Sequence, residues 1–292
     1  MIVSHVLGGI GNQMFQYAAG RSLAAHLKQE YFLDQSSFDG YSLHNGFELD
    51  QVFNIPTKEL DASILMDMLG WRFSRLAIKF LKRPQFSFLR GKNLVAEPHM
   101  HYWPLFFEAN ANTYLYGYWQ SEKYFKRIEA AIRQDFTFKR PLVEKNLDIA
   151  HHIASVNSVS LHVRRGDYVS HAKTSQIMDV CSLDYYRQAI DYITSHIQHP
   201  EFYIFSDDIA WVRQNLSLNF PCTYIDHNRG TESYRDMQLM SLCQHHVIAN
   251  SSFSWWGAWL NPNPKKLVVA PKAWFRNDTN DTDLIPDEWV RL

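Results

Sequence analysis

The sequence predicts an α/β protein built from two domains with a cleft between them. Short apolar segments typical of buried strands alternate with longer amphipathic segments typical of helices, which indicates parallel sheets covered on both faces. Polar residues follow several of these strands, and a length of 292 residues is ample for two domains. The natural division falls near residue 150, so we expect domains at 1–150 and 151–292.

The second half shows this alternation most clearly. Expected strands cover 158–163, 201–208, 222–225, 245–249 and 266–270, and expected helices cover 182–197, 209–216, 232–243 and 252–260. Ser182 is placed to cap the first of these helices. Because ligands bind beyond the carboxyl ends of strands in such sheets, we expect a ligand site in the loops after residues 163, 205 and 249.

The first half begins in the same way, with a strand at 2–7, a glycine-rich turn at 8–12 and a helix at 13–28. The turn, in "GGIGNQ", lacks the Lys-Ser/Thr end of a P-loop and the full glycine pattern of a dinucleotide site. It does place Asn12 and Gln13 where they would face the cleft. From about 34 to 120, turn signals and aromatic residues show no clear period.

Composition restricts the possible partners and location. The formal net charge of -1 gives no general attraction to nucleic acid, so an anionic ligand must be held by a local cluster. Three cysteines without paired spacing, and an opening segment without a charged-then-apolar leader, favour a reducing compartment. No apolar run approaches the roughly 20 residues of a membrane span. We therefore expect a cytoplasmic protein.

The stretch "HVRRGDY", residues 162–168, follows the expected strand at 158–163. His162, Arg164 and Arg165 would lie at its carboxyl end, where Gly166 lets the backbone turn. An arginine fork donates to two phosphate oxygens at once and stays charged at any working pH. An Arg–Asp pair that only fixes a loop fits these residues equally well.

Two further polar stretches follow strands. In "FSDD", residues 205–208, a carboxylate could accept N–H groups from a guanine edge, although Ser206 or Asp207 capping the next helix is the simpler interpretation. In "NSSFSWWGAW", residues 250–259, amides at a helix start and serine hydroxyls form an anion site. The helical spacing of the tryptophans predicts that they pack in the core; they are Trp255, Trp256 and Trp259.

The sequence offers little support for a metal site. "DTD" at 281–283 imitates the D-x-D of some nucleotide-sugar enzymes, but no strand precedes it, so we expect a solvated loop and no metal.

Taken together, "GGIGNQMFQYA", "HVRRGDY", "FSDDIAW" and "NSSFSWWGAWL" resemble the α-1,2-fucosyltransferases of glycosyltransferase family 11, in the order of that family. The resemblance implies a GT-B scaffold of two Rossmann-type domains, with the acceptor side in 1–150 and the donor side in 151–292. It implies inverting transfer of L-fucose from GDP-β-L-fucose to the 2-hydroxyl of a terminal galactose, as in surface glycan synthesis. It also implies no essential metal and no cofactor besides the donor.

The resemblance also implies roles for single residues. Arg164 would neutralise the β-phosphate, His162 would touch the ribose or a phosphate, and Asp207 would read guanine. Asp167 could take the proton of the acceptor or only hold Arg164, and His5 or an acidic residue of the first domain are rivals for the base. The remaining donor-binding candidates are Asn12, Gln13, Arg165, Ser206, Asn250, Ser251, Ser252, Phe253 and Ser254; Arg165 could instead be structural.

A basic segment from Trp71 to Lys92 is not explained by this resemblance. It holds seven basic residues and no acidic one, and the first four have helical spacing; they are Arg72, Arg75, Lys79, Lys82, Arg83, Arg90 and Lys92. A basic amphipathic helix can rest on an anionic membrane surface, which would make the protein peripheral on the inner face of a membrane. The alternative is an ordinary helix with a solvated basic face and an apolar face in the core.

Two other functions compete with a GDP-fucose-dependent transferase. A lectin-like or nucleotide-binding module would bind a glycan or nucleotide without turnover, and a related enzyme would use another GDP-sugar. The module explains the aromatic residues but not three polar strand ends that converge on a diphosphate.

Overall fold

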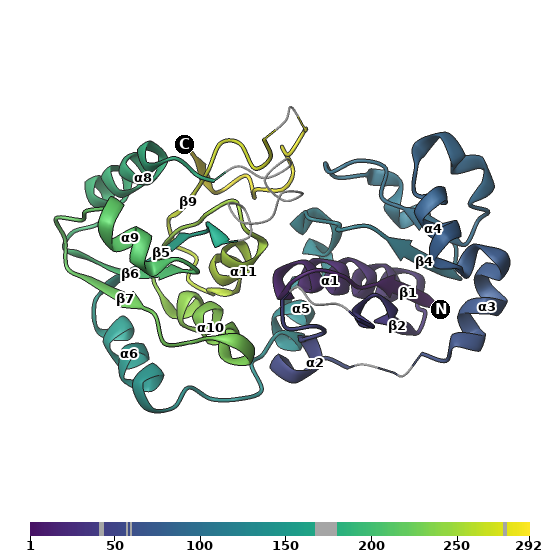
Figure 1. The fold of residues 1–292 in the computed structure, drawn as a ribbon, viewed down its shortest axis with the longest axis horizontal. Coiled ribbons are helices and arrows are strands. Elements are labelled where there is room, and N and C mark those ends of the chain that lie inside the picture. The colour runs from purple at the N-terminus through teal and green to yellow at the C-terminus, as the bar shows by residue number, and fades with distance from the viewer. Residues whose placement is uncertain (41–43, 57, 59, 167–179, 277–278) are drawn as a thin grey trace. The chain divides into compact units, whose positions relative to one another are not determined.

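The structure, a computed structural model, describes residues 1–40, 44–56, 58, 60–166, 180–276 and 279–292 (Figure 1). The chain forms two compact units, one of residues 1–139 with 282–284 and one of residues 140–281 with 285–292. The division precedes the predicted boundary because α6 (Glu144–Ser155) packs in the second unit, where Ile153 lies in a core cluster with Phe205 and Leu239.

The first unit contains a four-stranded parallel sheet in the order β2-β1-β4-β3. The predicted strand at 2–7 ends at His5. The other three strands were not predicted, and two of them, at 94–96 and 113–116, lie where turn signals and aromatic residues show no clear period. The strands are β1 (Ile2–His5), β2 (Tyr31–Asp34), β3 (Leu94–Ala96) and β4 (Thr113–Tyr116).

Helices pack on both faces of this sheet. A Cβ atom on Gly20 of α1 (Ile10–Leu27) would lie 2.1 Å from the Ser4 hydroxyl, so α1 packs closely on one face of β1. Val3, on the other face, shares a core cluster with α3 and α4. The other helical segments are α2 (Leu49–Val52), α3 (Ala62–Leu69), α4 (Arg75–Leu81), α5 (Glu129–Asp135), η1 (Ser36–Phe38), η2 (Gly70–Phe73), η3 (Pro84–Leu89), η4 (Pro104–Glu108), η5 (Glu122–Tyr124) and η6 (Lys126–Ile128).

Two predicted helices differ from the structure at their starts. The helix expected at 13–28 already begins at Ile10, after a turn in which Gly8 adopts a φ of +83°. The basic helix expected from Trp71 begins later than predicted, because α4 begins only at Arg75, where the Ser74 hydroxyl accepts the N–H of Ala77 at 3.1 Å. Residues 70–73 form η2 instead.

The second unit contains a six-stranded parallel sheet in the order β10-β9-β8-β5-β6-β7, which confirms the predicted α/β class. Its strands are β5 (Asn157–Val163), β6 (Pro200–Ser206), β7 (Cys222–Ile225), β8 (His245–Val247), β9 (Val268–Ala270) and β10 (Val290–Arg291). Its helical segments after α6 are α8 (Leu183–His196), α9 (Ile209–Asn215), η7 (Gly230–Glu232), α10 (Tyr234–Leu242) and α11 (Ser252–Leu260). The Ser182 cap is confirmed, since its hydroxyl accepts the N–H of Tyr185 at 3.1 Å.

Alternate residues of β6 show that both faces of this sheet are covered. Phe202 and Ile204 belong to a core cluster with α8 and α9. Tyr203 and Phe205 belong to another cluster with α6 and α10. A central strand that is buried on both faces is apolar throughout, which is why β6 was recognisable in the sequence.

The strand order brings three of the predicted loops to one edge. β5 lies between β6 and β8, with Val163 opposite Ser206 and Leu161 opposite Val247. The chain builds β6 and β7 on one side of β5 and β8 to β10 on the other, so the order reverses between β5 and β8. Ligands of open parallel sheets bind at such a reversal, beyond the carboxyl ends of the strands.

Residues 281–283 lie in a loop, as predicted, but the two aspartates of this loop are bound to the protein rather than solvated. Asp281 accepts the N–H of Trp274 at 2.7 Å, and Asp283 accepts the N–H of Tyr102 at 3.0 Å and pairs with Lys123. Leu284, which follows, is fully buried. Both aspartates therefore bind groups of the protein.

In the described ranges, no helix is both long enough and apolar enough to cross a membrane.

Candidate functional site

The carboxyl ends of β5 and β6 are joined through Asp207. One of its oxygens pairs with the Arg164 guanidinium at 2.9 Å, and the other accepts the backbone N–H of Arg165 at 2.9 Å. Gly166 makes this approach possible, because a Cβ atom there would lie 2.5 Å from the carboxylate. The Arg164 side chain is 23% exposed, so it is held in place and still accessible to a ligand.

The second arginine is bound to the protein. The Arg165 guanidinium stacks on the Trp211 ring at 3.8 Å, and its Nε lies 3.4 Å from the Asp208 carboxylate. Asp208 also caps α9 by accepting the N–H of Trp211 at 3.1 Å, so the prediction that Ser206 or Asp207 caps this helix is wrong. Ser206 instead accepts the N–H of Asp208 at 3.0 Å. These contacts favour the structural alternative for Arg165.

His162 is a buried, uncharged side chain next to this pair. It is 5% exposed, and its Nδ1 has no hydrogen-bond partner. Burial lowers the pKa of His162 to about 4, and the Arg164 charge adds to this effect against the opposing charge of Asp207. The ring centroid lies 5.9 Å from that of Phe253, which begins the neighbouring helix. At neutral pH this imidazole can therefore act as a neutral hydrogen-bonding group.

The loop after β8 leads into α11, as predicted. Asn250 is buried and donates to the Trp274 carbonyl at 3.1 Å, which gives it a structural contact. The Ser251 side chain makes no capping hydrogen bond, and Ser252 and Phe253 open the helix, where backbone N–H groups lack acceptors within the helix. Ser254 is buried and donates to the Ser251 carbonyl at 3.3 Å. The predicted core position of the three tryptophans is confirmed, since each is at most 3% exposed.

In the first unit, Asn12 and Gln13 are bound to the protein. Gln13 is fully buried, donates to the carbonyls of Gly8 and Gly46 at 2.8 Å each, and accepts the N–H of Glu48 at 2.9 Å. Both amide hydrogens are thus used, so Gln13 cannot contact a ligand in this arrangement. Asn12 accepts from Gln120 at 2.8 Å, which ties the glycine-rich turn to the loop after β4.

A hydrogen-bonded network surrounds His5 at the carboxyl end of β1. Its Nδ1 lies 3.2 Å from Asp34 and 2.9 Å from the Tyr114 hydroxyl, and its Nε2 lies 2.9 Å from the Ser37 hydroxyl. Burial would raise the pKa of Asp34, but hydrogen bonds from His5, Tyr114 and the Ser36 N–H lower it to about 2. Asp34 is therefore an anion that fixes the orientation of the imidazole.

Glu97 is in a different environment, just after β3. It accepts the N–H groups of Tyr118 and Trp119 at 2.7 and 2.9 Å. Burial raises the pKa of Glu97 to about 7 despite these two hydrogen bonds. A carboxyl group of this kind can exchange a proton near neutral pH, as a general base must. The sequence did not single out Glu97, because the short strand before it was not recognised.

Asp167 lies outside the described residues, so its two alternative roles stay predictions. The interdomain cleft also stays a prediction.

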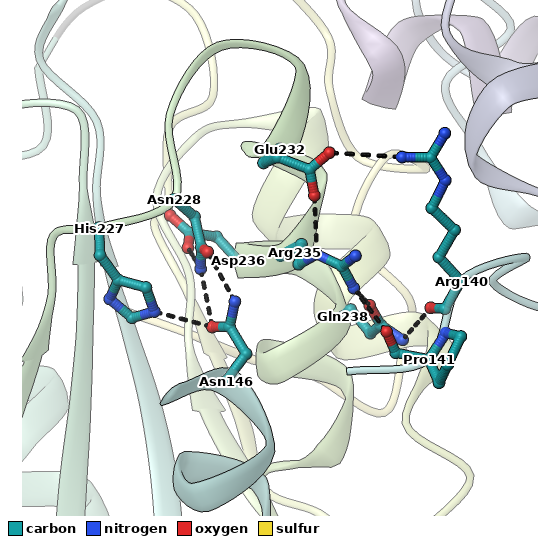
Figure 2. Close-up of polar contacts among 9 residues, drawn as sticks. All are labelled: Arg140, Pro141, Asn146, His227, Asn228, Glu232, Arg235, Asp236 and Gln238. Atoms are coloured by element: carbon teal, nitrogen blue, oxygen red, sulfur yellow. Dashed lines mark hydrogen bonds and ion pairs between the residues drawn. The ribbon is translucent and has the colours of Figure 1, made fainter. Parts of the chain in front are cut away.

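The loop after β7 is a further strand-end loop of the second sheet, and it was not predicted as part of a site. In Figure 2, the side chains of Asn146, His227, Asn228 and Asp236 form one network. Asn228 donates to Asp236 at 2.8 Å, and Asn146 accepts from His227 at 2.9 Å. These groups bind one another, which fixes the loop against the start of α6.

Helix α10, which follows this loop, holds the first residues of the second unit. Figure 2 shows Arg235 donating to the Pro141 carbonyl, at 2.9 Å, and to Glu232, at 2.8 Å. Gln238 donates to the Arg140 carbonyl at 3.3 Å, and the Arg140 guanidinium lies 3.6 Å from Glu232. The start of this unit is thus anchored by α10.

No group of three or more His, Cys, Asp or Glu side chains suited to a metal ion occurs among the residues that the structure describes.

The strand reversal of the second sheet thus carries an arginine and a serine-rich helix start, at the place where open parallel sheets bind their ligands. The chain belongs to glycosyltransferase family 11, since it matches the Glycosyl transferase family 11 model over residues 100–292. It is 34% identical to an alpha-1,2-colitosyltransferase of Escherichia coli, over 100% of this chain and 99% of that protein. It is 31% identical to the galactoside 2-alpha-L-fucosyltransferase SEC1 of Bos taurus, over 50% of this chain and 41% of that protein.

Among solved structures, the chain is similar to the NodZ alpha-1,6-fucosyltransferase co-crystallized with GDP. The TM-score is 0.52 with 14% sequence identity, covering 89% of this chain and 92% of that one. At this identity the likeness concerns the fold, which is a GT-B-like arrangement of parallel sheets.

The Asp236 carboxyl predicts a pH-dependent stability. Burial raises the pKa of Asp236 from its usual value of 3.8 to about 7, and the hydrogen bond from Asn228 only partly opposes this. The folded state then holds this proton more tightly than the unfolded state does. The protonated Asp236 therefore contributes fully to the free energy of unfolding below pH 3.8, and this contribution is lost as the pH rises through 7. Asp236→Asn should therefore gain stability over the native protein, on the order of 2 kcal/mol, between pH 5 and pH 7.

Urea unfolding of both proteins at several pH values measures this difference. Asp226→Asn, at an exposed position of the same loop, serves as the control. A difference between Asp236→Asn and the native protein that is the same at all pH values would contradict the prediction.

Proposed function

We propose that the protein transfers L-fucose from GDP-β-L-fucose to the 2-hydroxyl of a terminal galactose, with inversion to the α-linkage and without a metal or other cofactor. The observation that carries the proposal is the position of Arg164 at the strand reversal of the second sheet, where Asp207 orients it. Membership of family 11, and the names of the colitosyl and fucosyl relatives, support the reaction class.

The chemistry requires a fixed positive charge at this point. As the acceptor oxygen bonds to C1 of the sugar, the bond from C1 to the β-phosphate oxygen breaks, and GDP leaves with an added negative charge. Arg164 would stabilise that charge as it develops, without needing to reorganise. The first-turn amides of α11, with Ser251 and Ser252, would bind the other diphosphate oxygens.

Other residues would orient the donor. The unpaired Nδ1 of buried His162 suits a hydrogen bond with the ribose or a phosphate. The Phe253 ring lies beside that of His162 and would line the same part of the donor site. Asn250 and Ser254 bind backbone carbonyls and would hold the loop after β8 in place. Asp207 contacts Arg164 and Arg165, so we propose that it positions Arg164; reading of guanine by Asp207 or Ser206 is the rival role.

The proton of the acceptor hydroxyl must pass to a base. Asp167 remains our candidate from the sequence, with His5 as a rival. Glu97 is the acidic residue of the first unit that best fits the third alternative, because the pKa of about 7 suits a group that accepts a proton at neutral pH.

The reaction itself is the first test. Incubation with GDP-L-fucose and lactose should release GDP and form 2'-fucosyllactose, and activity should survive EDTA. GDP-fucose binding without product would favour a nucleotide-binding module, and loss in EDTA with rescue by Mn²⁺ would contradict the metal-free reaction.

The same assay with GDP-colitose tests the donor. Colitose lacks the 3-hydroxyl of L-fucose. A site that hydrogen-bonds this hydroxyl rejects the deoxy sugar by roughly 10⁴-fold in kcat/KM, whereas an apolar site rejects the extra hydroxyl by only about 10²-fold. We expect GDP-L-fucose to be preferred; a preference for GDP-colitose would assign the chain to another GDP-sugar.

Removing the Arg164 guanidinium should cost most of the stabilisation of the leaving group. We expect Arg164→Ala to lower kcat by roughly a hundredfold, on the order of 3 kcal/mol, with the fold intact. Arg187→Ala, which removes an exposed arginine paired with Asp184 on α8, is the matched control. Near-normal turnover of Arg164→Ala would remove Arg164 from its proposed role.

A double-mutant cycle separates the two roles of Asp207. If Asp207 acts through Arg164, Asp207→Asn alone should lower kcat about tenfold, but should cost little when added to Arg164→Ala. If Asp207 instead hydrogen-bonds guanine, the decreases in kcat caused by the two substitutions should multiply, and Asp207→Asn should raise the Kd for GDP with or without Arg164→Ala. Asp208→Asn, next to it, is the control because Asp208 binds Arg165 and caps α9.

A further inference from the structure

The first unit exposes an unusual number of apolar side chains in one segment. Ten large hydrophobic side chains are exposed among the described residues, and five of them lie between 66 and 88. Leu76 is 81% exposed, Phe88 78% and Trp71 59%, and Met66 and Phe80 complete the set. Scattered single residues of this kind are normal, but a concentration in one segment marks an interaction surface.

These side chains are not the ones that hold the segment to the unit. Leu65 and Leu69 of α3, and Ile78 and Leu81 of α4, are buried in the core cluster on the sheet. The apolar side chains that pack in the core are thus a different set from the exposed ones. An ordinary helix with a solvated basic face and an apolar face in the core describes α4 only in part, because the exposed Leu76 also lies on it.

Basic side chains lie among the exposed apolar ones. Leu76, Lys79 and Phe80 have the spacing of one face of α4, Arg83 follows the end of that helix, and all four are exposed. The interval from Trp71 to Lys92 has no acidic residue. The chain as a whole carries a net charge of -1, so this positive charge is local to the segment.

Two arginines of the segment bind backbone carbonyls of the protein. Arg72 donates to the Leu89 carbonyl at 2.6 Å, and Arg90 donates to the Leu81 carbonyl at 2.8 Å. These two arginines connect α4 and η3 to their neighbours and give the segment a fixed shape. Among the side chains of this segment that the structure describes, the exposed cations are Lys79, Lys82, Arg83 and Lys92.

We propose that the surface formed by Met66, Trp71, Leu76, Phe80, Phe88 and these four cations, here called the 66–92 surface, binds anionic lipid bilayers peripherally. Apolar and aromatic side chains would enter the interfacial region, while lysine and arginine head groups bind lipid phosphates. A protein partner fits less well, because it would need an acidic surface matched to cations that alternate with apolar side chains. An anionic bilayer offers negative charge and an apolar interior over its whole surface.

Co-sedimentation with vesicles tests the 66–92 surface in the whole protein. We expect binding to equimolar phosphatidylcholine and phosphatidylglycerol, and much weaker binding to phosphatidylcholine alone. Each basic residue near such a surface contributes about fivefold to partitioning, so changing Lys79, Arg83 and Lys92 to Gln should weaken binding roughly a hundredfold. Changing Trp71, Leu76 and Phe88 to Gln should also weaken it, because less apolar surface is buried.

Matched variants in the second unit control for charge and hydrophobicity. Changing Arg187, Lys265 and Lys272 to Gln removes the same charge, and changing Leu147 and Leu242 to Gln removes exposed apolar side chains. Both should bind vesicles as the native protein does. Transfer to a soluble galactoside should be unaffected by the 66–92 variants, which shows that they fold and separates this proposal from the proposed reaction.

Three results would overturn the proposal. They are equal partitioning to neutral and anionic vesicles, binding that survives both sets of changes in the 66–92 surface, and absence of vesicle binding together with a dimer that these changes abolish. The last result, measured by sedimentation velocity, would assign the surface to a second copy of the chain.

Discussion

The ion pair between Arg164 and Asp207 depends on the register of two parallel strands. β5 and β6 end side by side, with Val163 opposite Ser206, so residues that follow these positions meet at the same edge of the sheet. Asp207 can then bind both the Arg164 side chain and the Arg165 backbone. The remaining features of this edge, Gly166, the cap by Asp208 and the stack of Arg165 on Trp211, all maintain that geometry.

Carboxyl groups of this chain are held in two opposite kinds of environment. Donors surround Asp34 and hold its pKa at about 2, so it is a permanent anion. Burial dominates at Glu97 and Asp236, and raises the pKa of each to about 7. Environments that separate the pKa values of like groups are a common way to divide acid–base roles within a protein. The neutral imidazole of His162 extends this contrast to the donor side.

How far the sequence predicts this structure depends on segment length and on which residues share a contact. β5 and β6 have seven residues each and are almost entirely buried, so both they and the polar loops after them were predicted. β2, β3 and β4 were not predicted, so Asp34 at the end of β2 and Glu97 after β3 were missed; β3 and β4 lie where turn signals and aromatic residues show no clear period. The pairing of Arg164 with Asp207 could not be predicted, since it depends on the register of β5 and β6.

The residues Thr282–Leu284 belong to the first unit although almost the whole second unit precedes them in the chain. Asp283 pairs with Lys123, and Leu284 is fully buried. During synthesis on the ribosome, a domain at the start of a chain can usually fold before the next one emerges. Here the first unit lacks Thr282–Leu284, and with them the buried Leu284, until residues 140–281 of the second unit have been translated. Maturation of the two units is therefore coupled in time, and neither sequence half encodes a complete unit.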